Sequence, residues 1–226
     1  MRDFLMMICP YAIWGIVAGE VVIAALLFSL SARKKSKIAR WSGILTLGLI
    51  VDAAIIGLGA ILTPEALQKI SPIRFVAHGL LIPLLFPICG YALNFRKPLM
   101  FIVWTFTVGL MIAGVLQALK TELVTETIAG VTRMKAGEGT PKWADAISRG
   151  LSFGTVIPMM IAGVIVWIRQ KTPHLFLAGF LMFAFSALGP ATGNTDLIFF
   201  ISMFGEILMV LFLYLYARAK SKKEAR

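Results

Sequence analysis

The chain has 226 residues, of which 59% are hydrophobic and 15% are charged, and its mean hydropathy is +0.88. Water-soluble domains are nearer half apolar and a quarter charged, so this composition excludes an ordinary soluble domain. The formal net charge is +11, but the basic residues lie in short clusters between apolar runs, which argues against a nucleic-acid partner and indicates membrane topology.

Apolar runs divide the chain into seven segments that meet or approach the roughly 20 residues a helix needs to cross a bilayer. They predict an all-α, polytopic membrane bundle that forms a single transmembrane domain over residues 1–226. The predicted spans are 11–31, 41–62, 73–93, 98–120, 151–169, 174–189 and 196–217. The first run contains Glu20 and ends without a small-residue cleavage site, so we interpret it as a retained span and not as a signal peptide.

Basic residues decide the expected orientation, because cytoplasmic loops are enriched in Lys and Arg. Fourteen of the 22 basic residues fall on one predicted side. They are Arg33, Lys34, Lys35, Lys37, Arg40, Arg96, Lys97, Arg169, Lys171, Arg218, Lys220, Lys222, Lys223 and Arg226. This places the N-terminus outside and the C-terminus in the cytoplasm, and predicts that anionic lipids contact the basic loops. Aromatic residues near the inner ends, among them Tyr91, Trp167 and Tyr216, fit the headgroup level.

The outer side is predicted to hold a loop over 63–72, a longer segment over 121–150 and a turn over 190–195. In the longer segment, Thr140 and Pro141 are typical of a helix start, so we expect a short helix that runs into the fifth span. The segment is expected either to lie on the membrane surface or to cover a vestibule.

Three carboxylates are the strongest functional signal. Glu20, Asp52 and Glu206 each lie about ten residues into a predicted span, hence about 15 Å deep. An unpaired ionised group costs at least a few kcal/mol there, so such residues mark ion paths and relays. Three at one depth suit a proton or a cation. The alternative is that each is separately hydrogen-bonded to a neighbouring helix and holds the bundle together.

The third predicted span carries Arg74 and His78, four residues apart and therefore on one helix face. Pro83 and Pro87 follow and predict a kink that frees backbone carbonyls to line a cavity. The alternatives are that Arg74 reaches lipid phosphates and that His78 is a hydrogen-bonded packing residue.

Polar residues before the last span form the third feature. Asn194 and Asp196 either cap that helix or line the mouth of a cavity.

Small residues elsewhere are interpreted as packing residues. Gly150-Leu151-Ser152-Phe153-Gly154 matches a nucleophile motif that needs a strand before it, so we assign it to helix packing. Gly15 and Gly19 are assigned to packing as well, and their spacing permits a homo-oligomer. No His or Cys cluster predicts a metal site, and the sequence identifies no cofactor.

The leading functional hypothesis is a transport protein, a proton- or cation-coupled carrier or channel for a small ion or small molecule, with Glu20, Asp52, Arg74, His78 and Glu206 along its path. The first alternative is an intramembrane enzyme that acts on a lipid or other apolar substrate. The second is a non-catalytic subunit or receptor-like scaffold. The expected location is a cell membrane, the plasma membrane of a prokaryote.

Overall fold

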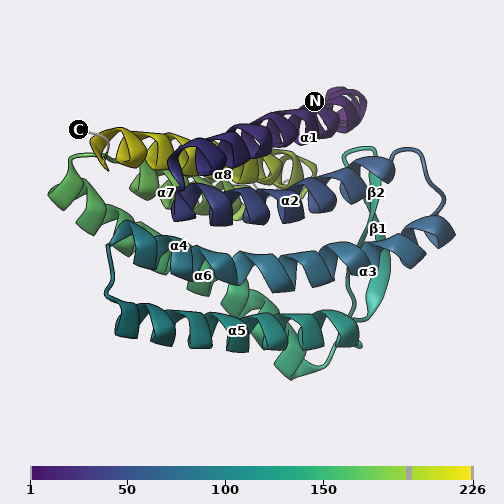
Figure 1. Cartoon of the computed structure of the whole chain (residues 1–226). Helices are drawn as coiled ribbons and strands as arrows, with labels where there is room; N and C mark the ends of the chain where they lie inside the picture. The colour runs from purple at the N-terminus through teal and green to yellow at the C-terminus, as the bar shows by residue number, and fades with distance from the viewer. Residues whose placement is uncertain (1, 192–194, 225–226) are drawn as a thin grey trace.

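The computed structural model describes residues 2–191 and 195–224, with the side chains of residues 6–186 and 196–224. Long helices form a bundle, and a small two-stranded sheet lies at one end of it (Figure 1). The elements are α1 (Arg2–Lys34), α2 (Lys37–Leu58), α3 (Pro64–Leu81), a 3₁₀ turn (Ile82–Leu84), α4 (Leu85–Ala92), α5 (Lys97–Lys120), β1 (Leu123–Ile128), β2 (Val131–Ala136), α6 (Lys142–Gln170), α7 (His174–Ala191) and α8 (Thr195–Glu224).

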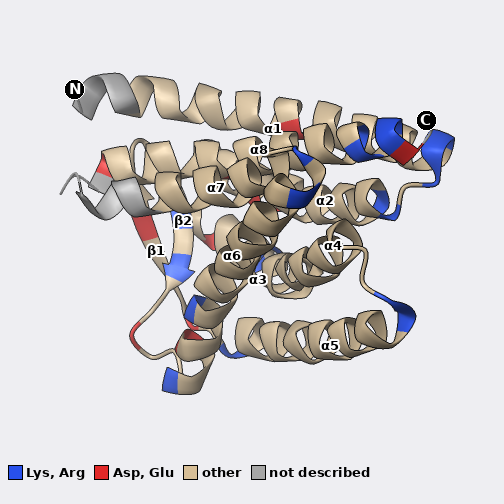
Figure 2. Cartoon of the chain, turned by 90° about the vertical axis from the view of Figure 1, so that its left-hand side faces the viewer, with Lys and Arg blue, Asp and Glu red and all other residues tan. Residues whose placement is uncertain are grey.

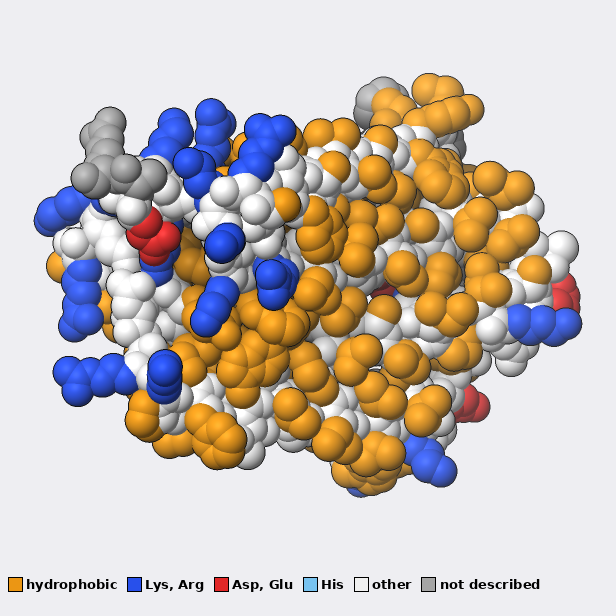
Figure 3. Space-filling view, viewed as in Figure 1, with side chains coloured by type: hydrophobic (Ala, Val, Ile, Leu, Met, Phe, Trp, Pro, Cys, Tyr) orange, Lys and Arg blue, Asp and Glu red, His pale blue; other side chains and the backbone are white. Residues whose placement is uncertain are grey.

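Within the described part of the chain, six helical segments are long and apolar enough to cross a membrane, and α7 is a shorter apolar helix. Large apolar side chains such as Phe101, Ile102 and Ile168 stand exposed on the outside of the bundle. Figure 3 shows this apolar surface over the middle of one face, with charged side chains toward its two ends. The predicted helical membrane bundle therefore agrees with the length of the helices and with the apolar surface that they present.

Lys and Arg gather at the end of the bundle that holds the α1–α2, α4–α5 and α6–α7 connections and the end of α8 (Figure 2). Each of the three connections contains a residue other than glycine with a positive φ angle: Lys35 at 51°, Asn94 at 56° and Lys171 at 53°. Lys171 ends α6, and its backbone N–H donates to the Trp167 carbonyl. A left-handed residue at this place stops a helix and turns the chain sharply, so these connections stay short.

The third apolar segment differs from its predicted form at its start and agrees with it at the kink. The predicted loop over 63–72 is wrong, because α3 already begins at Pro64, where Thr63 Oγ1 accepts a hydrogen bond from the Ala66 N–H. The predicted kink is confirmed: a 3₁₀ turn that contains Pro83 interrupts the segment between α3 and α4. Proline lacks the N–H that a regular helix needs, which explains the interruption at this place.

Residues 121–150 contain a hairpin that the sequence analysis did not predict. Strands β1 and β2 pair antiparallel, with Ile128 opposite Val131. Ala129 and Gly130 form the turn, and both have a positive φ angle, 49° and 77°. This geometry matches the twist of paired strands. The predicted helix start is confirmed near Pro141, although α6 is one continuous helix with the fifth span and not a separate short helix.

The hairpin covers one end of the bundle. Ile128, Ala129 and Val131 are buried in a core cluster with residues of α1, α2 and α8. The Thr132 N–H donates to the Gly59 carbonyl, and the Ala129 N–H donates to Asp196 Oδ1 at 2.7 Å. The segment over 121–150 was expected either to lie on the membrane surface or to cover a vestibule. The structure favours the second placement, because the hairpin packs over the ends of the helices.

An ion cluster on the hairpin joins the two strands. Glu126 accepts hydrogen bonds from Arg133 and Lys135, at 2.8 Å and 2.7 Å for the shortest contacts. Partial burial raises the pKa of Glu126, but the hydrogen bonds from Lys135 and Arg133 outweigh it and leave the pKa below its ordinary value. The charged form of Glu126 therefore stabilises the pairing of β1 with β2.

Candidate functional site

An ion pair joins α2 to α3 in the half of the bundle nearest the hairpin. Arg74 Nε lies 2.8 Å from Asp52 Oδ1, and the two side chains are 13% and 9% exposed. Arg74 Nη1 also donates to the Met134 carbonyl of β2 at 3.2 Å. The guanidinium therefore points into the bundle, and it connects the predicted site to the hairpin instead of reaching toward lipid phosphates.

Glu206, on α8, has a different environment. Its Oε2 is enclosed by protein, yet no described residue gives it a hydrogen bond. The carboxylate lies within electrostatic range of Asp52, Glu20 and Arg74. Because Asp52 already has a counter-ion in Arg74, Glu206 is a carboxylate without a cationic partner of its own. The side chain is half-buried and borders mainly apolar space, so partial loss of hydration favours binding of a proton or a cation at this carboxylate.

Glu20, on α1, is fully buried, and neither of its carboxylate oxygens has a hydrogen-bond partner among the described residues. It lies within electrostatic range of Asp52. It does not line either of the two cavities that Asp52 and Glu206 border. The three predicted carboxylates thus share one region of the bundle, but Glu20 lies behind the wall of the site.

Two adjoining cavities form the candidate site. The smaller, of about 200 Å³, lies in the half nearest the hairpin and is bordered by Asp52, Arg74, His78, Gln117 and Glu206. The larger, of about 360 Å³, extends toward the middle of the bundle. His78, Ser152 and Glu206 border both. Four of the five predicted path residues therefore line connected space, and these shared residues are where the two cavities meet.

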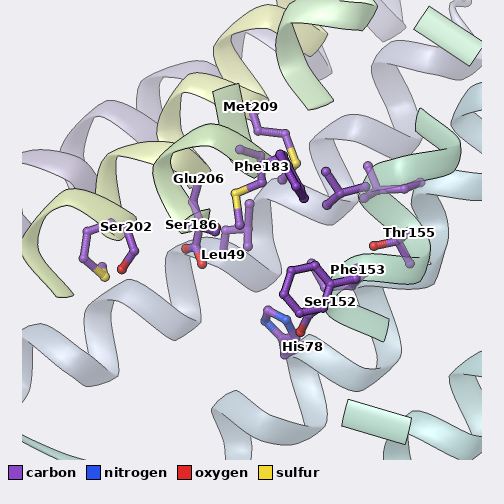
Figure 4. A pocket seen from close by; sticks show the side chains of 15 residues that line it. Leu49, His78, Ser152, Phe153, Thr155, Phe183, Ser186, Ser202, Glu206 and Met209 are labelled. Atoms are coloured by element: carbon purple, nitrogen blue, oxygen red, sulfur yellow. The ribbon is translucent and has the colours of Figure 1, made fainter. Parts of the chain in front are cut away.

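The larger cavity has mainly apolar walls. Figure 4 shows Glu206 and Ser186 extending into it from α8 and α7, and His78, Ser152 and Phe153 from α3 and α6. The remaining apolar wall consists of Leu49, Ile82, Leu85, Val156, Met182, Phe183, Met203 and Met209. A few polar groups within an apolar enclosure are typical of a site for a small organic ligand.

Several cavity residues were missed by the sequence analysis. The assignment of the Gly150–Gly154 motif to helix packing is wrong, because no atom lies within 4 Å of where a Cβ on either glycine would stand, while Ser152 faces both cavities. Ser202 was missed although it stands four residues before Glu206, hence on the same helix face. That spacing is a signal that sequence reasoning could have used.

Asp196, at the start of α8, contacts the hairpin and not the two cavities. Asp196 lies in the first turn of α8, where its carboxylate accepts a hydrogen bond from the hairpin, and it does not border either cavity. Asn194 lies outside the described residues. Asp196 therefore holds the hairpin against α8, and the predictions that Asn194 and Asp196 cap this helix or line a cavity mouth stay predictions.

A hydrogen-bonded cluster joins α4, α6 and α8 at the basic end of the bundle. Tyr216 is fully buried, and its hydroxyl donates to Gln170 Oε1 at 3.1 Å. Gln170 Nε2 donates to the Ala92 carbonyl at 2.9 Å, and Lys220 Nζ donates to the Tyr91 carbonyl at 2.7 Å. The Tyr216 side chain thus joins α8 to α4 and α6 inside the protein and does not face lipid.

In the ranges 2–191 and 195–224, no three His, Cys, Asp or Glu side chains come together in a way that would hold a metal ion. No protein-family model matches the chain, and no curated protein is significantly similar to it in sequence.

Proposed function

We propose that this protein is an integral membrane transport protein, a carrier that couples its substrate to protons or cations. The observation that carries the proposal is the unpaired Glu206 carboxylate on the wall of a cavity inside an apolar helical bundle. A group of this kind favours an exchange of proton for cation, because either one relieves the cost of the buried charge.

The position of the cavities supports a carrier more than an open channel. The cavities lie between the hairpin and the middle of the bundle, and the hydrogen-bonded cluster around Tyr216 and Gln170 joins α4, α6 and α8 between these cavities and the basic end. A site with packed protein between it and one end of the bundle is the arrangement expected of alternating access. In the proposed orientation the basic end faces the cytoplasm, in line with the distribution of Lys and Arg, and the hairpin faces the outside of a cell membrane.

The enzyme hypothesis receives less support from the same residues. Ser152 and His78 border the same cavities, but the Ser152 hydroxyl donates to the Ser148 carbonyl of its own helix at 3.1 Å. A serine activated as a nucleophile needs its hydroxyl hydrogen-bonded to a base instead.

The test is flux of protons and of monovalent inorganic and organic cations into liposomes that contain the purified protein. We expect wild type to carry flux and Glu206→Gln to lose at least nine-tenths of it. Glu138→Gln is the matched control, since Glu138 is an exposed residue in the loop after β2. Equal flux from wild type and Glu206→Gln, or none from wild type under any imposed gradient, would reject the proposal.

A further inference from the structure

The charges around the larger cavity are not balanced. Asp52 and Arg74 neutralise each other through their contact at 2.8 Å. Glu206 borders the cavity without such a partner, and Glu20 lies behind it within electrostatic range. Both carboxylates disfavour an anion in this space, whereas a cation beside Glu206 gains an opposite charge in a medium of low dielectric constant.

The walls are unsuited to a bare inorganic cation. Hard cations need several oxygen ligands to replace the water that they lose. The oxygen-bearing side chains on this cavity are Ser152, Thr155, Ser186, Ser202 and Glu206. Three of the hydroxyls, those of Ser152, Thr155 and Ser202, already donate to backbone carbonyls of their own helices. Glu206 is the one carboxylate among these residues, so the described wall offers a hard cation a single charged ligand group, and the other oxygens belong to neutral hydroxyls.

The same walls suit an organic cation. Phe153 and Phe183 offer aromatic rings, which attract ammonium groups, and the sulfur atoms of Met182, Met203 and Met209 are polarisable. The volume of about 360 Å³ lies in the range of small-ligand sites. Phe153 is also 52% exposed, so it borders both the cavity and the lipid-facing side of α6, where an apolar molecule can enter from the bilayer.

We propose that the larger cavity binds a lipophilic organic cation, a substituted ammonium whose charge pairs with Glu206 and whose apolar body lies against Phe153, Phe183 and the three methionines. The inference rests on the proposed transport function and names its substrate class.

The experiment measures saturable binding of radiolabelled benzyltrimethylammonium to the full chain in lipid nanodiscs, so that binding is separated from transport. We expect Glu206→Gln to weaken binding at least tenfold and Phe183→Ala to weaken it about threefold to tenfold, because the two changes remove the counter-charge and one ring. Glu138→Gln should bind like wild type. An excess of 2,2-dimethylpropylbenzene, which has the same shape without the charge, should compete poorly, as should Na⁺ and K⁺.

Two results would overturn the inference: binding that Glu206→Gln leaves unchanged, and competition by Na⁺ as strong as competition by unlabelled probe. The binding measurement and the flux measurement test different proposals, so a negative result in one does not imply a negative result in the other. Cation flux without binding of the ammonium rejects this substrate class and leaves the transport proposal standing. Glu206-dependent binding without flux supports the site and rejects the carrier.

Discussion

At the scale of single residues, the carboxylates that the sequence places at one depth have three different environments. Asp52 has a guanidinium partner, Glu206 borders a cavity without one, and Glu20 is enclosed behind it. The depth of each carboxylate within its span could be predicted, because it follows from counting residues along a helix. The environment depends on how each helix is rotated about its axis, which the neighbouring helices decide.

The Asp52–Arg74 pair should show strong coupling in stability. Arg74→Met leaves a buried carboxylate unpaired, so we expect it to lower the free energy of unfolding by about 3 kcal/mol, the low end of the cost for broken buried pairs because Arg74 borders a cavity. Addition of Asp52→Asn should recover part of this loss. Equilibrium unfolding in mixed micelles measures both values.

The control for the ion pair is Lys69→Met, the same substitution at an exposed position of α3. It should change the free energy of unfolding by less than about 0.5 kcal/mol. Purely additive losses from the two site substitutions would contradict the coupling.

At the scale of elements, one close helix crossing holds α3 against α5. A Cβ built on Gly114 would stand 2.4 Å from the Gly79 carbonyl oxygen, and a Cβ on Gly79 would stand 2.5 Å from the Gly114 carbonyl oxygen. The two backbones are therefore in direct contact. Since Gly79 follows His78, this crossing also helps to fix the side of α3 that faces the cavities.

Gly114→Ala should push α3 and α5 apart. We expect a loss of about 1–3 kcal/mol in the free energy of unfolding, because a methyl group has no space between two backbones. Gly109→Ala on the same helix is the control: no atom lies within 4 Å of its added Cβ, so higher helix propensity should leave stability unchanged or slightly increased. Equal effects from the two substitutions would show that the crossing does not matter.

Sequence reasoning predicted the long apolar helices but missed the hairpin and the start of α3. Helices were predicted because about 20 apolar residues in a row carry a strong local signal. The hairpin was missed because the interpretation of residues 121–150 rested on low apolarity and on the helix start at Thr140 and Pro141, and strand and turn signals were not used. Thr125, Thr127 and Val131 favour strands, and Ala129-Gly130 between two such runs is a turn signal that was available. The start of α3 at Pro64 was missed because Glu65 and Lys69 interrupt the apolar pattern.

At the scale of the whole molecule, charge divides the bundle into a basic end and a hairpin end (Figure 2). Only the distribution of Lys and Arg predicts which end faces the cytoplasm. Both native cysteines, Cys9 and Cys89, are buried. The chain therefore offers a low background for thiol labelling, and its orientation is open to a direct test.

Labelling with a membrane-impermeant maleimide on intact cells should distinguish the two ends. We expect Glu138→Cys, near the hairpin, to react from outside, and Lys97→Cys, at the exposed start of α5, to react only after the membrane is permeabilised. The unsubstituted chain should remain unlabelled in both conditions. The reverse pattern would invert the topology, and equal labelling of both positions in intact cells would rule out a single orientation.

The sharp turns at Lys35, Asn94 and Lys171 have a mechanical consequence. Each turn joins two consecutive helix segments at the basic end, and these short connections limit how far the joined helix ends can separate. At those far ends the hairpin fastens α2, α3 and α8 to one another through Gly59, Arg74 and Asp196. Helices are therefore held together at both ends of the bundle by different means: short covalent connections at the basic end, and hydrogen bonds to the hairpin at the opposite end.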